Sequence, residues 1–88
     1  MYVVEILDAL GDPAEFVVVS PVVALDLALR AQRAGLRWRV VDESSTRSLP
    51  IEDLRHVALR FAARDPAASE HLRQAECDNE RAVVAALN

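Results

Sequence analysis

Three of the four prolines stand at predicted helix starts and divide the 88-residue chain into its elements. Serine and aspartate accept hydrogen bonds from the free N–H groups of a first helical turn, and proline fits the first helical position. Ser20-Pro21 and Asp65-Pro66 carry this pattern, and Pro50 precedes an acidic first turn. The sequence therefore predicts three helices, over 21–34, from 50 onward, and from 66 to near Asn88.

The remaining segments predict strands. Residues 2–7 are dense in β-branched side chains, 16–19 form a second short run, and 36–41 alternate between apolar and polar. A turn cluster around Gly11 indicates a hairpin between the first two. We predict one α+β domain over 1–88, in the order β-β-α-β-α-α, with helices packed on the sheet. The sheet has three strands, or four if the extended piece near Arg47 pairs.

Length and charge exclude several classes of protein. Eighty-eight residues support one hydrophobic core, and 52% hydrophobic with 27% charged residues excludes a disordered chain. The net charge of -4 disfavours nucleic acid, which requires a concentrated basic face. One cysteine cannot form an internal disulfide, and the N-terminus lacks a signal-peptide pattern. The apolar runs are too short to span a membrane, so we expect a cytoplasmic protein.

Two segments carry more apolar surface than a small sheet and three helices should cover. Helix 21–34 has only Asp26, Arg30 and Arg33 as a polar stripe, and strand 16–19 is apolar on both faces. Such a surplus indicates a subunit interface. The leading hypothesis is a non-enzymatic interaction protein that binds a second copy of itself or another chain. The candidate interface residues are Val17, Val19 and Leu27, or Leu72, Asn79 and Val83 on the third helix.

Asn79 interrupts the apolar stripe of the third helix. A single buried asparagine can set the register and oligomeric state of paired helices. Alternatively, the helix leaves the core at this point and Asn79 is hydrated. The sequence leaves both interpretations open.

The alternative function is a small ligand-binding or enzymatic domain. If strands 16–19 and 36–41 run parallel, the start of helix 21–34 meets the polar segment 42–48 at one end of the sheet. Helix N-termini attract anions, although Asp42-Glu43 and the lack of a glycine-rich loop oppose a simple phosphate site. The candidate ligand-binding residues are Ser20, Asp42, Glu43, Ser45 and Arg47.

The remaining reactive side chains give weaker patterns. We interpret His56 as a surface residue and His71 as a residue at the border of the core. Cys77, between Arg73 and Arg81, could have a lowered thiol pKa, but a solvated free thiol is the simpler interpretation. We predict no catalytic residue and no cofactor. We also predict no metal site, because no CxxC or HxxxH spacing occurs. The arginines around Trp38 suggest single-stranded nucleic acid only as a third hypothesis.

Overall fold

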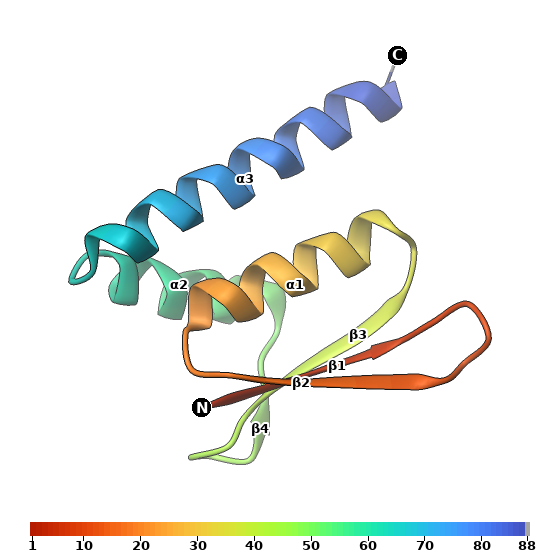
Figure 1. The fold of residues 1–88 in the computed structure, drawn as a ribbon, viewed down its shortest axis with the longest axis horizontal. Coiled ribbons are helices and arrows are strands. Elements are labelled where there is room, and N and C mark those ends of the chain that lie inside the picture. The colour runs from red at the N-terminus through yellow and green to blue at the C-terminus, as the bar shows by residue number, and fades with distance from the viewer. Residues whose placement is uncertain (88) are drawn as a thin grey trace.

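The computed structural model describes residues 1–87 and confirms the α+β class (Figure 1). The extended piece near Arg47 does pair, so the order is β-β-α-β-β-α-α. The predicted end of the last helix at Asn88 lies outside the described residues. The elements are β1 (Tyr2–Leu7), β2 (Pro13–Val18), α1 (Pro21–Arg33), β3 (Arg37–Asp42), β4 (Arg47–Ser48), α2 (Ile51–Ala62) and α3 (Pro66–Leu87).

The four strands form one antiparallel sheet in the order β2-β1-β3-β4. Val4 in β1 lies opposite Phe16 in β2 and Val40 in β3. Because β2 and β3 are both antiparallel to β1, they run in the same direction with β1 between them. Their carboxyl ends therefore meet at one end of the sheet, as the sequence predicted for parallel strands, although the two strands are not neighbours.

Strand β2 begins at Pro13, three residues before the predicted start at Phe16, and ends one residue before Val19. The hairpin turn explains the earlier start. The Asp8 carboxylate accepts hydrogen bonds from the N–H groups of Leu10 and Asp12, both at 2.9 Å, and Gly11 takes a φ of +84°. This tight turn brings Pro13 directly opposite Leu7, so residues with no strand pattern of their own are paired.

Helix α1 lies between the sheet and the other two helices (Figure 1). Ser20 caps it as predicted, because its hydroxyl accepts a hydrogen bond from the Val22 N–H at 3.2 Å. Gly35 follows it with a φ of +72°, the left-handed conformation that favours glycine. Leu25 and Leu29 are almost completely buried, and each such side chain stabilises the fold by about 1.5–3 kcal/mol.

The other two helices cover most of the apolar surface of α1. Leu54 in α2 and Leu72 in α3 are buried in the same core as α1. The expectation that α1 would leave a large uncovered surface is therefore wrong. The expectation assumed that α1 could be covered only by the sheet. Because α2 and α3 pack on α1 itself, the small area of the sheet does not limit how much of α1 is buried.

Helix α3 diverges from α1 toward its C-terminal end (Figure 1). Arg33, in the last turn of α1, donates a hydrogen bond to the Asn79 side-chain oxygen at 3.3 Å. Before this point α3 buries Leu72 and Ala75, whereas after it Val83 is 52% exposed. Asn79 therefore marks the place where α3 leaves the core, and it is half-buried there.

Candidate functional site

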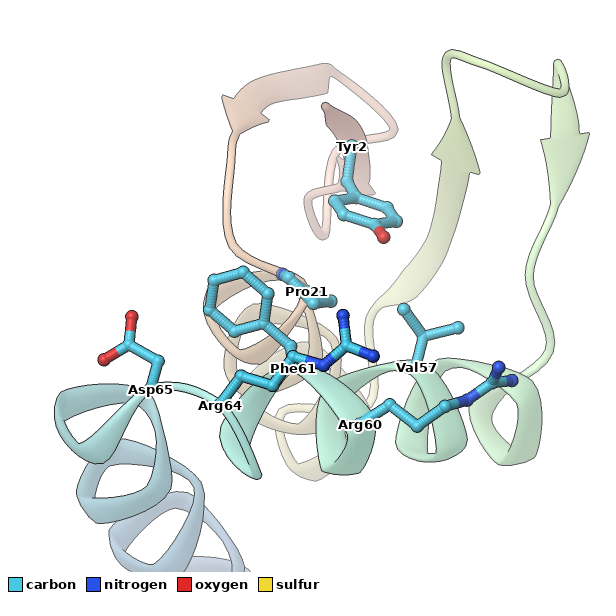
Figure 2. Close-up of a pocket in the computed structure, with 7 residues that line it drawn as sticks. All are labelled: Tyr2, Pro21, Val57, Arg60, Phe61, Arg64 and Asp65. Carbon is cyan, nitrogen blue, oxygen red and sulfur yellow. The ribbon is translucent and has the colours of Figure 1, made fainter.

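An open groove of about 620 Å³ lies at the end of the sheet where β2 and β3 finish (Figure 2). The start of β1 and the start of α1 form one wall, and the second half of α2 with the turn that follows it forms the other. The lining residues are Tyr2, Pro21, Val57, Arg60, Phe61, Arg64 and Asp65.

The lining combines apolar surface with two cations. Figure 2 shows the Tyr2 hydroxyl pointing toward α2 and the Arg64 side chain reaching into the space beneath the Tyr2 ring. Arg60 lies in the last turn of α2, whereas Arg64 lies in the turn that follows the helix. The Arg60 side chain extends past Val57, away from that of Arg64 (Figure 2). Val57 and Phe61 are half-buried and form the apolar part of the α2 wall. The groove therefore presents hydrogen-bond donors above an apolar floor.

The hydroxyl of Tyr2 remains protonated at neutral pH. Burial, and then the negative charge of Asp42 on the neighbouring strand, raise the pKa of Tyr2 above its ordinary value of 10.0. The pKa of Asp42 is lowered, because its carboxylate accepts hydrogen bonds from the Ser44 hydroxyl at 2.7 Å and the Ser44 N–H at 3.0 Å. Asp42 thus stays ionised beside a neutral phenol.

The structure places the predicted ligand residues near this groove without making them its lining. Ser20 and Asp42 lie at the same end of the sheet, but the Ser20 hydroxyl caps α1 and the Asp42 carboxylate holds its own turn. Glu43, Ser45 and Arg47 are exposed in and beside the tight turn between β3 and β4. None of the five lines the groove.

Sequence reasoning missed the residues that do line it. No motif in the sequence singles out Arg60, Phe61 or Arg64. Their spacing brings them within about one helical turn of one another, which was the only available signal. That α2 stands opposite Tyr2 depends on tertiary packing, and the spacing contains no information about it.

A second polar cluster joins α1 to α3. Asp26 is only 8% exposed, and its carboxylate contacts the Arg30 Nε at 3.1 Å and the His71 Nε2 at 3.0 Å. Arg30 lies one turn after Asp26 on the same helix, whereas His71 belongs to α3. The contact between Asp26 and His71 therefore joins α1 to α3.

The interface candidates fall into two groups. Val17 is 57% exposed, Val19 73% and Val83 52%, so all three are available to another chain. Leu27 is half-buried against the core and Leu72 is only 6% exposed. The described residues therefore offer two apolar surfaces, the β2 edge and the free end of α3.

The remaining reactive groups gain no further partners. Cys77 is an exposed free thiol. Arg73, predicted to flank it, is 2.9 Å from the Glu70 carboxylate instead. Among residues 1–87, no group of three potential metal ligands comes together.

No protein-family profile, curated protein or solved structure matches this chain. Within the part of the chain that the structure describes, no helix has the length and apolar character needed to cross a membrane. The features that bear on function are therefore the groove and the exposed apolar surfaces.

Proposed function

We propose that this protein is a non-enzymatic interaction protein that assembles as a homodimer by pairing the β2 strands of two copies. One observation carries the proposal: β2 is an edge strand with exposed apolar side chains on both faces. Phe16 is 42% exposed on the face that carries the helices, and Val17 is 57% exposed on the other. An unprotected edge of this kind is a template for pairing with another strand.

The two edges of the sheet differ, and the difference favours a second copy of this chain as the partner. The opposite edge, β4, has two residues, whereas β2 has six. Pairing of β2 with β4 of another copy would involve few hydrogen bonds and would build an open filament. Pairing of β2 with β2 uses the same surface twice and gives a closed two-fold dimer.

The backbone of β2 is correctly phased for this pairing. The Asp8 N–H donates to the Asp12 carbonyl at 3.1 Å, and antiparallel partners alternate between hydrogen-bonded and non-hydrogen-bonded pairs. Even-numbered residues of β2 therefore bond to β1. The backbone groups of Glu15 and Val17 point away from β1, toward the free edge.

The arrangement of charge on β2 supports a register centred on Phe16. In that register the two Phe16 rings face each other on the side that carries the helices, where aromatic cross-strand pairs are favourable. Glu15, the one ionisable side chain within β2, then lies opposite Val17 of the second copy. The Glu15 carboxylates of the two copies therefore do not lie opposite each other, and the strand can pair with a second copy of itself.

The test compares two valines of similar exposure, Val17 at 57% and Val83 at 52%. We expect the wild-type protein to have the mass of a dimer by light scattering. Val17→Glu should give the monomer mass, because it places two carboxylates opposite each other at the interface. Val83→Glu, the matched control on the free end of α3, should leave the dimer intact.

Two results would contradict the proposal. If Val83→Glu dissociates the dimer and Val17→Glu does not, the interface is α3. If the wild-type protein is a monomer at every concentration, it does not form the proposed homodimer. The β2 edge would then be free to accept a strand of a different protein.

A further inference from the structure

We infer that the groove between Tyr2 and α2 binds a small organic anion, a carboxylate or phosphate group attached to an apolar body. This inference does not depend on the dimer, because the groove lies on the side of the sheet that carries the helices and includes no β2 residue. Three observations support it: the state of the charges, the shape of the apolar wall and the position of the donors.

The cations of the groove are free, whereas its neighbouring anions are already bonded. Among residues 1–87, neither Arg60 nor Arg64 forms an ion pair. By contrast, the Asp65 carboxylate caps α3 by accepting hydrogen bonds from the N–H groups of Ala67 at 3.0 Å and Ala68 at 3.3 Å. Asp42, beside Tyr2, is bonded to Ser44. The two arginines therefore supply unused hydrogen-bond donors, while the Asp65 carboxylate, which accepts both of its hydrogen bonds through Oδ1, is the one anion in the lining.

Guanidinium groups bind carboxylate and phosphate oxygens through paired, charge-assisted hydrogen bonds. Arg64 reaches the space beneath Tyr2, and the protonated Tyr2 hydroxyl points into the same space (Figure 2). Arg60 adds a second positive charge at the rim of the groove, where its side chain extends past Val57 and away from Arg64 (Figure 2). The start of α1 at Pro21 contributes the positive end of a helix dipole to the same wall. An oxyanion held here would have donors on two sides.

The apolar wall selects for more than an inorganic ion. Tyr2, Val57 and Phe61 are all half-buried, so each offers part of its side chain to a ligand. A cavity of about 620 Å³ falls within the size range of small-molecule sites, and it is far larger than one oxyanion requires. The chain carries a net charge of -4, so bulk electrostatics repel anions and the apolar contact must add to the affinity.

The test is a titration followed by amide resonances of the ¹⁵N-labelled full chain. The probes are phenyl phosphate and benzoate, which share an aromatic body and differ in the anionic group, together with inorganic phosphate and phenol as the separate halves. We expect at least one aromatic anion to shift the amide resonances of Tyr2 and of the segment from Val57 to Arg64. Each half alone should bind more weakly, and the better aromatic anion identifies the anionic group.

The variants separate the groove from general charge effects. The double substitution Arg60→Gln with Arg64→Gln should weaken binding by roughly tenfold or more, the loss expected for charged hydrogen bonds. Arg55→Gln, on the same helix but outside the groove, removes the same kind of charge and should change little. All three arginines are exposed, and the spectra themselves report whether each variant is folded.

Three outcomes would overturn the inference. The first is that neither aromatic anion shifts the groove resonances. The second is that the double variant binds the anion as tightly as Arg55→Gln does. The third is that inorganic phosphate binds as tightly as phenyl phosphate, which would show that the apolar wall has no role. None of these results would change the mass measurements that test the dimer.

Discussion

Helix α1 and strand β2 carry similar apolar sequences but have opposite environments. Leu25 and Leu29 of α1 are at most 1% exposed, whereas Phe16 and Val17 of β2 are 42% and 57% exposed. Both segments carry more apolar surface than a single packed face requires. The difference is position: α1 has the sheet on one side and two helices on the other, while β2 lies at the edge of the sheet, pairs with no described strand except β1 and has only limited contact with α1.

This comparison separates apolar residues that build the fold from apolar residues available to a partner. Leu25 stabilises the fold of each copy by itself. Val17 contributes little to that fold, and we propose that it stabilises the assembly. The two kinds of residue therefore respond to different measurements, one to unfolding free energy and the other to mass.

The largest expected effect comes from the buried side of the comparison. Leu25→Ala should lower the free energy of unfolding by about 2–5 kcal/mol, because it removes a fully buried side chain and leaves a cavity. Urea unfolding measures this loss. Val17→Ala, measured on dilute monomer, should change stability by only about 0.5 kcal/mol. Equal losses at the two positions would refute the distinction between α1 and β2.

The second prediction tests the exposed side through the backbone. Val17→Pro removes one N–H that points to the free edge, and proline is tolerated on edge strands at such positions. We expect the dimer to weaken by roughly tenfold or more while circular dichroism stays unchanged. Phe16→Pro removes an N–H that bonds to β1, so it should destabilise the monomer itself by about 3 kcal/mol. If Val17→Pro instead unfolds the protein, the N–H of Val17 faces β1 and the proposed phase of the strand is wrong.

The third prediction concerns the contact that holds α3 on α1. His71→Leu removes a hydrogen-bonding partner of the mostly buried Asp26 carboxylate and should cost about 1–2 kcal/mol in urea unfolding. Arg30→Gln removes the other partner, whose side chain is 63% exposed, and should cost less than about 1 kcal/mol. The reverse order would mean that Arg30 dominates the cluster.

The smallest effect is expected at the turn between β3 and β4. Hydrogen bonds from Ser44 lower the pKa of Asp42, so the ionised carboxylate stabilises the folded state at pH values above its ordinary pKa of 3.8. This contribution is lost as the pH falls through the lowered pKa. Ser44→Ala should therefore be slightly destabilising at neutral pH and neutral at strongly acidic pH. A difference that grows under acid would contradict this sign.

Much of the fold was predictable because its signals are local. Ser20-Pro21 and Asp65-Pro66 place two helix starts, and Gly35 places a helix end. The start of β2 was not predictable, because Pro13 is brought into the sheet by the Asp8 turn. The first residue of β2 is set by the pairing of Pro13 with Leu7, because Pro13 has no strand propensity of its own.

The candidate site was predictable only in its location. The direction of β2 and β3 brings Ser20 and Asp42 to one end of the sheet, as expected. The groove at that end is lined by Arg60 of α2 and by Arg64 in the turn after it, and the position of this segment opposite Tyr2 arises from helix packing. The contact between His71 and Asp26 was missed for the same reason, because the residues are 45 positions apart.

Amide hydrogen exchange along β2 tests the central claim most directly. The N–H groups of Phe16 and Val18 point to β1 and should be protected at any concentration. At concentrations where the dimer forms, the N–H groups of Glu15 and Val17 should become protected as well. A dimer by mass in which Glu15 and Val17 exchange freely would contradict pairing through β2.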